Sequence, residues 1–388
     1  MLEKKLVEKM GLKCKIFFIP LCCCFLLTAC LDARNLEELG LVTVAGYDKE
    51  ENLLRGTIVY YEFDPLHPNN TKLVTTVAHT AKGIRQRENF SSSRRLLAGQ
   101  VRSVIFGKEL AEQGMIQYID TLGRDAEIGT MVYLAVSEIP AYDLLTSAQQ
   151  SRDITNAGTY LYELIRQNVE TESLISPTLH EFMQCYYSEG RDATVPLLDF
   201  TQGTMYVKGI ALFQDDKVVG AMSTKELFFL KLLKDPFKAG NVELEIPKES
   251  LEKFIKPGEE RNDERVYLSL EHLNSDVKIK MLDESIPSFE VTINFDTRIQ
   301  EISENYDIGN PKSLEHLEVE ISKDIAKHTE EIIQKLQSVN SDPVGFGNVY
   351  RARVGYKKFD KTKWREQYPD ASITVIVDSN ILRTGVMD

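Results

Sequence analysis

Four residues near the amino terminus, Leu27, Thr28, Ala29 and Cys30, have the types and the spacing of a bacterial lipobox. Small residues before the cysteine let a signal peptidase approach, and the cysteine thiol accepts diacylglycerol before the chain is cleaved in front of it. We therefore predict cleavage between Ala29 and Cys30. The mature protein would then begin at a lipidated cysteine and hold to a membrane by its two acyl chains.

The residues before the lipobox agree with this interpretation. An apolar stretch, residues 16–28, follows a basic region, which is the order found in a secretory signal peptide. The basic residues are Lys4, Lys5, Lys9, Lys13 and Lys15. The apolar stretch contains Pro20 and is shorter than the roughly 20 residues that a membrane-spanning helix needs. We assign residues 1–29 to the leader; a start at Met10, or an ordinary signal peptide with a chance cysteine, are the alternatives.

Cysteine use and charge narrow the class of protein further. Only Cys185 remains as a free thiol in the mature chain, and we expect it to be a small buried hydrophobic residue. The chain has a net charge of −13, and loss of a leader with five lysines against Glu3 and Glu8 makes the mature part more acidic still. Such a charge argues against nucleic acid as a partner and against broad adhesion to anionic lipid.

The remaining candidates for chemistry are weak. No nucleophile elbow, phosphate-binding loop or zinc-protease helix occurs in the sequence. His316, Glu320 and Asp324 recur every four residues and would share a helix face, which is the geometry of a metal site. Charged residues at this spacing more often form a solvated stripe. We therefore expect no catalytic, cofactor-binding or metal-binding residues, and no enzymatic activity.

Two acidic pairs and one glycine pair are interpreted in the same way. The carboxylate pairs occur in expected turns or exposed segments and lack the apolar surroundings that tune a catalytic acid. They are Asp215 with Asp216 and Glu259 with Glu260. Gly345 and Gly347 lack the third glycine of a dinucleotide-binding loop, so we expect a turn that requires a positive φ.

Residue patterns predict an α+β fold of several domains, with mixed sheets and packed helices. Residues 30–200 alternate strand-like and helix-like segments and form the first predicted domain. The strands are expected at 56–63, 101–106 and 130–137, and the helices at 80–90, 108–122, 142–150 and 154–169. Residues 91–95, three serines and two arginines, are expected to be a local polar loop rather than a basic contact site.

The second half has a different pattern. A β-hairpin at 205–222 opens a small β-rich middle domain, residues 201–256. The last domain, residues 257–388, is expected to hold a hairpin at 266–282, strands at 289–302 and 372–377, and a long amphipathic helix that begins near Pro311. We expect an antiparallel sheet with this helix laid on one face.

The order of several short segments resembles the Ger(x)C family, the C subunits of bacterial spore nutrient germinant receptors. No single segment is specific, but together they span nearly all of the mature chain. The segments are Cys30, Asp32, Leu36 and Leu39; Gly46 to Lys49; Val207 to Phe213 with Gly220; Asp342 to Gly347; Trp364 to Glu366; and Ile373 to Val377 with Ile381 to Gly385.

This resemblance implies a lipoprotein on the outer face of the inner spore membrane. It implies action through assembly with the integral membrane A and B subunits in spore germination, without enzymatic activity. Two other classes stay open. A solute-binding lipoprotein that presents a ligand to a transporter would need a cleft between two similar lobes. An envelope hydrolase would need a nucleophile with a base, or a metal site.

Overall fold

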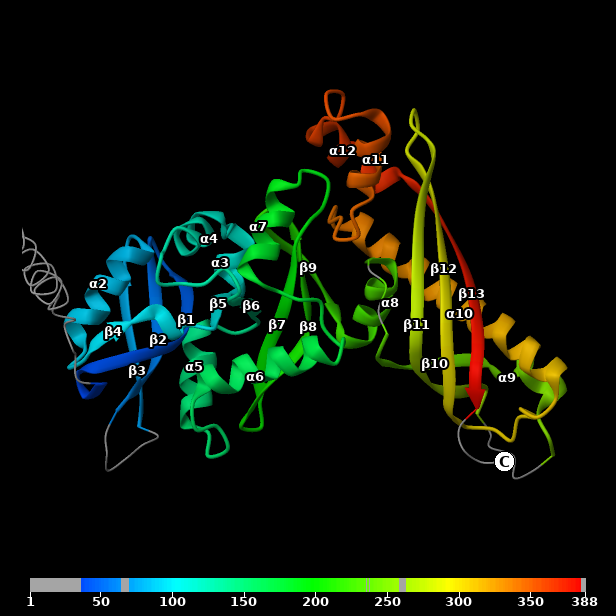
Figure 1. The fold of residues 1–388 in the computed structure, drawn as a ribbon, viewed down its shortest axis with the longest axis horizontal. Coiled ribbons are helices and arrows are strands. Elements are labelled where there is room, and N and C mark those ends of the chain that lie inside the picture. Colours follow the sequence, from blue (N-terminus) through cyan, green and yellow to red (C-terminus); the bar gives the residue numbers. More distant parts are fainter. Residues whose placement is uncertain (1–35, 64–69, 235, 237, 258–262, 385–388) are drawn as a thin grey trace, which may run out of the picture.

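The computed structural model describes residues 36–63, 70–234, 236, 238–257 and 263–384. The predicted leader, the cleavage position Ala29 and the lipidation position Cys30 lie outside the described residues, as do Glu259 and Glu260. The described chain is elongated, with a nine-stranded sheet in one half and a four-stranded sheet in the other (Figure 1).

The first sheet is mixed. Its order is β3-β2-β1-β5-β6-β7-β8-β9, with the short β4 beside β1. The pairs β1–β5, β5–β6 and β6–β7 are parallel, and hairpins add the outer strands antiparallel. The strands are β1 (Leu39–Glu50), β2 (Leu53–Glu62), β3 (Thr71–Ala78), β4 (Arg95–Leu97), β5 (Ser103–Gly107), β6 (Tyr133–Ser137), β7 (Thr194–Thr201), β8 (Thr204–Gln214) and β9 (Lys217–Ser223).

Helices cover both faces of this sheet (Figure 1). One face carries α2, α3, α4 and α7, whose apolar side chains form a core with the strands. The opposite face carries α5 and α6, which form a second core. The helices are α2 (Ala81–Ser91), α3 (Lys108–Gln113), α4 (Ile116–Gly123), α5 (Ala141–Gln150), α6 (Ala157–Glu170) and α7 (Leu179–Tyr187). Cys185 of α7 is buried in the first of these cores, as predicted.

Local signals explain where these helices begin and end. The hydroxyl of Thr80 accepts from the Gly83 N–H at the start of α2, and Thr178 forms a capping box with Glu181 at the start of α7. The single helix predicted at 108–122 is instead two helices, α3 and α4. Gly114 ends α3 with a φ of 122°, a conformation that side-chain-bearing residues rarely adopt, and this breaks the helix.

The second sheet has the order β10-β11-β12-β13. Its strands are β10 (Asn241–Pro247), β11 (Arg265–Asp283), β12 (Ser288–Ile302) and β13 (Ser372–Thr384). The last pair, β12–β13, is parallel, so the sheet is mixed and not antiparallel throughout as predicted. A long helix explains the difference. The 28 residues of α10 (Pro311–Ser338) return the chain about 42 Å, nearly the length of β12, before β13 begins.

The hairpin predicted at 266–282 is one continuous strand, β11. Asn274 and Ser275, expected to form its turn, pair with Asp296 and Phe295 of β12. A register shift between His272 and Asn274 marks a bulge at this position. Because β12 continues past the bulge, its hydrogen bonds keep β11 extended where the local sequence favours a turn.

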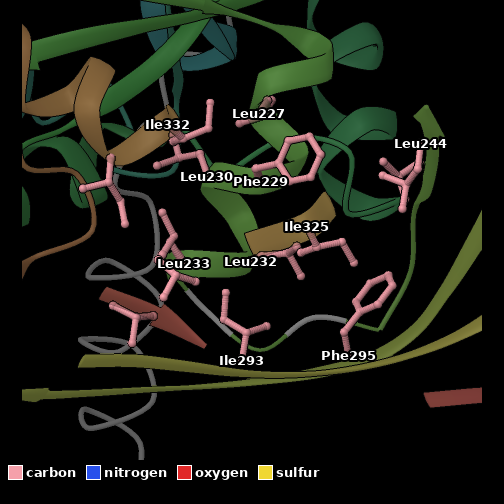
Figure 2. Close-up of a cluster of buried hydrophobic side chains, with 14 of the residues drawn as sticks. Leu227, Phe229, Leu230, Leu232, Leu233, Leu244, Ile293, Phe295, Ile325 and Ile332 are labelled. Carbon is pink, nitrogen blue, oxygen red and sulfur yellow. The ribbon is translucent and has the colours of Figure 1, made fainter. Parts of the chain in front are cut away.

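Residues 201–256, predicted as a middle domain, are divided between the two sheets. β8 and β9 complete the first sheet, whereas β10 begins the second. Between them lies α8 (Thr224–Lys234), which packs against α10 and the second sheet (Figure 2). Its buried residues are Leu227, Phe229, Leu230, Leu232 and Leu233. The remaining helices are the short α9 (Lys248–Leu251), α11 (Phe346–Val354) and α12 (Lys361–Gln367).

Candidate functional site: the joint between the two halves

The three residues of α10 that share the spacing of a metal site have separate partners. The Nε2 atom of His316 lies 2.7 Å from the carbonyl oxygen of Ser250, Glu320 pairs with Lys323, and the Asp324 carboxylate lies 3.6 Å from the ring of His328. Within the part of the chain that the structure describes, no three potential ligands gather in a way that could hold a metal ion.

The Asp215 and Asp216 pair has a structural role in the turn between β8 and β9. Asp215 has a φ of 57°. Its carboxylate lies 2.5 Å from the Lys361 ammonium and 3.3 Å from the Arg365 guanidinium, so the turn touches α12. Asp216 accepts from the Ile116 N–H, 3.0 Å away, at the start of α4. These acids therefore join elements that are more than 90 residues apart in sequence.

Asp192 and Arg365 form the centre of this contact. Arg365, on α12, donates through both terminal nitrogens to the two carboxylate oxygens of Asp192, one of them at 2.5 Å. The Asp192 side chain is 1% exposed and that of Arg365 is 14% exposed. Asp192 also accepts from the backbone N–H groups of Asp215 and Asp342. We call Asp192, Asp215, Asp342, Lys361 and Arg365 the ionic joint, because they connect the two halves.

The segment that begins at Asp342 shows what its glycines do. The Asp342 carboxylate, fully buried, accepts three backbone hydrogen bonds, from Gly345, Phe346 and Gly347 at 2.8 to 3.0 Å. Gly345 has a φ of 92°, which confirms the predicted turn. Burial raises the pKa of Asp342 to about 6, against the effect of the three N–H donors. The carboxylate thus holds the turn that starts α11.

Aromatic rings surround this turn. Phe346 packs on Phe289 of β12 and on Tyr368, and Trp364 packs on Tyr350 and Tyr368. An added Cβ at Gly347 would lie 2.5 Å from Trp364 Nε1 and 2.8 Å from the carbonyl oxygen of Gly190. Only glycine fits between the halves at that position. The joint is therefore closely packed as well as ionic.

A cavity of about 380 Å³ opens beside the joint. It is lined by the segment after α6, by α7 and the start of β7, and by α8 and Pro236. Its charged lining residues are Glu172, Glu181, Arg191, Lys231 and Lys234. Within the described residues, Nε of Arg191 and the hydroxyl of Thr194 are buried without a hydrogen-bond partner. The cavity could hold a small polar molecule or several water molecules.

Sequence reasoning named three parts of this arrangement but did not connect them. They are the turn at 342–347, the acidic pair that includes Asp215, and the segment Trp364 to Glu366, which contains Arg365. Asp192, which binds all three parts together, was missed. It is 150 residues from Asp342 and 173 from Arg365, so no local spacing identifies it.

None of the helices in the described part of the chain has the length and the apolar character needed to span a bilayer. The fold and the joint define a two-lobed α+β protein whose lobes are fixed to each other by buried contacts. Two family models match it: the spore germination protein N-terminal domain over residues 32–200, and the spore germination B3/GerAC-like C-terminal domain over residues 208–385. The chain therefore belongs to the GerAC-like family of spore germination proteins, which confirms the resemblance in the sequence.

Individual relatives match over nearly their whole length. Spore germination protein GerQC of Bacillus cereus is 27% identical over 93% of this chain and 96% of its own. Spore germination protein KC of Bacillus subtilis is 20% identical over 96% of each chain. The crystal structure of the GerBC protein has the same fold, with a TM-score of 0.56 and 15% identity over 87% of this chain and 96% of that one.

Proposed function

We propose that this protein is the C subunit of a spore nutrient germinant receptor. In this proposal it is anchored through lipidated Cys30 on the outer face of the inner spore membrane. It acts by assembly with the integral membrane A and B subunits, and not by catalysis. The observation that carries the proposal is the match of both family models, which together span residues 32–385 with only a short gap.

Two further observations support an assembly role. The carboxylates at the centre of the molecule are each held by N–H, ammonium or guanidinium donors, which suits a rigid joint better than a reacting group. A diacylglycerol anchor confines a protein to a thin layer beside its membrane partners. Its effective concentration there is high, so modest interfaces suffice for assembly.

Germination assays test this function directly. Deletion of the gene should abolish germination through one nutrient receptor, while the A and B subunits can still enter the membrane. A tagged full-length chain should capture both subunits from detergent-solubilised spore membranes. Unchanged germination towards every nutrient, in a strain without a redundant receptor, would contradict the proposal.

A Cys30→Ala variant tests the anchor separately. We expect it to remain unprocessed or to be released from the membrane fraction, because the thiol that accepts diacylglycerol is gone. Cys185→Ala is the matched control, since this buried thiol should have no part in processing. A Cys30→Ala protein that is still cleaved and membrane-bound would refute the lipobox assignment.

A second candidate function is the binding of a small solute, and the cavity beside the joint favours it. The two halves have sheets of nine and four strands, which is unlike a pair of similar lobes. A saturable rise in the thermal unfolding midpoint with an amino acid or a sugar would support solute binding. Arg191→Ala should then remove the rise if the cavity is the site.

A further inference from the structure

The mature chain enters its fold at one end of the elongated molecule. β1 begins at Leu39, and Arg95 of β4 pairs beside it in parallel register. The amide oxygen of Asn89, on α2, accepts from the Leu96 N–H at 3.1 Å, which ties the end of α2 to β4. Figure 1 shows α2 and β4 at the end of the molecule opposite to the second sheet.

The outer surface at this end is basic and carries an exposed aromatic ring. Ile84 and Glu88 of α2 point into the protein, whereas Lys82, Arg87 and Phe90 are exposed. Phe90 is 83% exposed, the highest value among the exposed large hydrophobic side chains of the described residues. We call Lys82, Arg87, Phe90 and Arg95 the α2 patch.

The charge of this patch is opposite to that of the whole molecule. Residues 80–97 contain five basic side chains and one acidic side chain, in a chain of net charge −13. Arg85 pairs with Asp125 and Glu127, and Arg94 pairs with Glu62. In the described part of the chain, Lys82, Arg87 and Arg95 form no ion pair.

Chain length keeps the proposed anchor within reach of this end of the molecule. Cys30 precedes Leu39 by nine residues, which span at most about 30 Å when fully extended. We infer that the α2 patch lies on an anionic bilayer surface, with Phe90 among the lipid headgroups. This inference rests on the proposed anchoring at Cys30.

Elementary electrostatics supports this orientation. Anionic headgroups attract basic residues within about a Debye length of the surface, and aromatic rings favour the headgroup region. The rest of the protein is acidic, so the same surface repels it. The molecule should therefore stand on its amino-terminal end, with the second sheet directed away from the bilayer. A protein partner seated on the patch is the competing possibility.

The test uses a fluorescent probe at position 90. A Phe90→Cys variant can be labelled selectively because Cys185 is only 5% exposed. A hexahistidine tag replaces Cys30 and attaches the full mature chain to vesicles through a nickel-chelating lipid, so attachment does not depend on natural lipidation. Tyr356→Cys, at a 78% exposed aromatic residue in the other half, is the matched control. The vesicles contain phosphatidylcholine with or without phosphatidylglycerol.

We expect acrylamide to quench the probe at position 90 several-fold less on vesicles with phosphatidylglycerol than on vesicles of phosphatidylcholine alone. Quenching of the probe at position 356 should be the same on both. Adding Arg87→Glu and Arg95→Glu should restore full quenching, because both side chains are exposed and their charge is reversed. Equal quenching at position 90 on both kinds of vesicle would overturn the inference. Protection that appears only when the A and B subunits are present would overturn it too, in favour of a protein partner.

The outcomes separate this inference from the proposed function. If the probe at position 90 is protected from acrylamide on nickel-lipid vesicles but the native protein carries no lipid, the patch is supported and the anchor is refuted. If the native protein is lipidated at Cys30 but the probe at position 90 of the tethered form is not protected, the anchor is supported and the patch is refuted.

Discussion

Arg365 and Asp192 are the residues through which the joint can be tested most directly. Replacing Arg365 by Met should lower the free energy of unfolding by about 3–5 kcal/mol, because it leaves the buried Asp192 carboxylate without its main counter-charge. Lys361→Ala is the matched control. It breaks a more exposed pair with Asp215, worth about 1 kcal/mol or less.

Urea unfolding of both variants measures these effects. Adding Asp192→Asn to Arg365→Met should recover part of the loss, since the stranded charge is then removed. If Arg365→Met and Lys361→Ala lower the free energy of unfolding equally, the joint contributes no more than a surface ion pair. The interpretation that it fixes the two halves to each other would then be wrong.

Glu88, beneath α2, gives a pH-dependent prediction. It is 3% exposed, one of its carboxylate oxygens has no partner among the described residues, and burial raises its pKa from 4.5 to about 7. Between pH 4.5 and about pH 7, the Glu88 carboxyl is protonated in the folded state and ionised in the unfolded state. Stability due to Glu88 is therefore highest below pH 4.5 and falls as the pH rises towards 7.

A Glu88→Gln variant lacks this dependence. Its free energy of unfolding should exceed that of the original protein by up to about 3 kcal/mol at pH 8, and the two should be equal near pH 4.5. Thermal unfolding at a series of pH values measures the difference. A difference that stays constant across the series would show that the Glu88 carboxyl does not titrate in this window.

At the residue scale, the sequence predicted features whose cause is local. The positive φ of Gly345 and the burial of Cys185 are of this kind. The ionic joint is not, because Asp192 acquires its partners only when the two halves meet. The residues around Asp192 and those around Arg365 give no indication that the two side chains pair.

At the scale of elements, α10 protects the free edge of β13. Glu318 accepts from the Ile381 N–H at 2.8 Å, and the Ser322 hydroxyl accepts from the Ser379 N–H at 3.0 Å. Unpaired edge groups of a sheet are open to pairing with other chains, and these side chains occupy two of them. The helix thus both packs on the sheet and closes its edge.

Removing both side chains, as Glu318→Ala with Ser322→Ala, should expose that edge. We expect faster amide hydrogen exchange at Ser379 and Ile381 and a greater tendency to aggregate. Glu315→Ala, on an exposed position of the same helix, should change neither. Unchanged exchange at Ser379 and Ile381 in the double variant would show that β13 needs no such protection.

The same scale shows which elements a sequence can reveal. α10 was predicted because one of its faces is apolar and the other is charged, and this period identifies a half-buried helix. α8 was missed because apolar residues are buried on several of its sides, so no such period appears. The parallel pairing of β13 was missed because it depends on where three preceding helices return the chain.

At the scale of the whole molecule, β8 belongs to both halves. Ile210 and Leu212 lie in the core that includes α8 and the second sheet, whereas Ala211 and Phe213 lie in a core of the first sheet. Alternate residues of a strand point to opposite faces, so one strand contributes to two cores. The predicted boundaries near 200 and 256 mark changes in residue pattern, while the packing continues across them.

This sharing predicts that the two halves unfold together. Phe106 is fully buried in the first half, and Phe106→Ala should cost about 3–5 kcal/mol. Trp364, the only tryptophan, is buried in the core of the second half, so its fluorescence follows the unfolding of that core. If β8 and the ionic joint couple the halves, Phe106→Ala must lower the midpoint of urea unfolding by the same amount whether unfolding is followed by Trp364 fluorescence or by circular dichroism. Independent domains would leave the Trp364 midpoint where it was, and the molecule would then be two stable lobes that only touch.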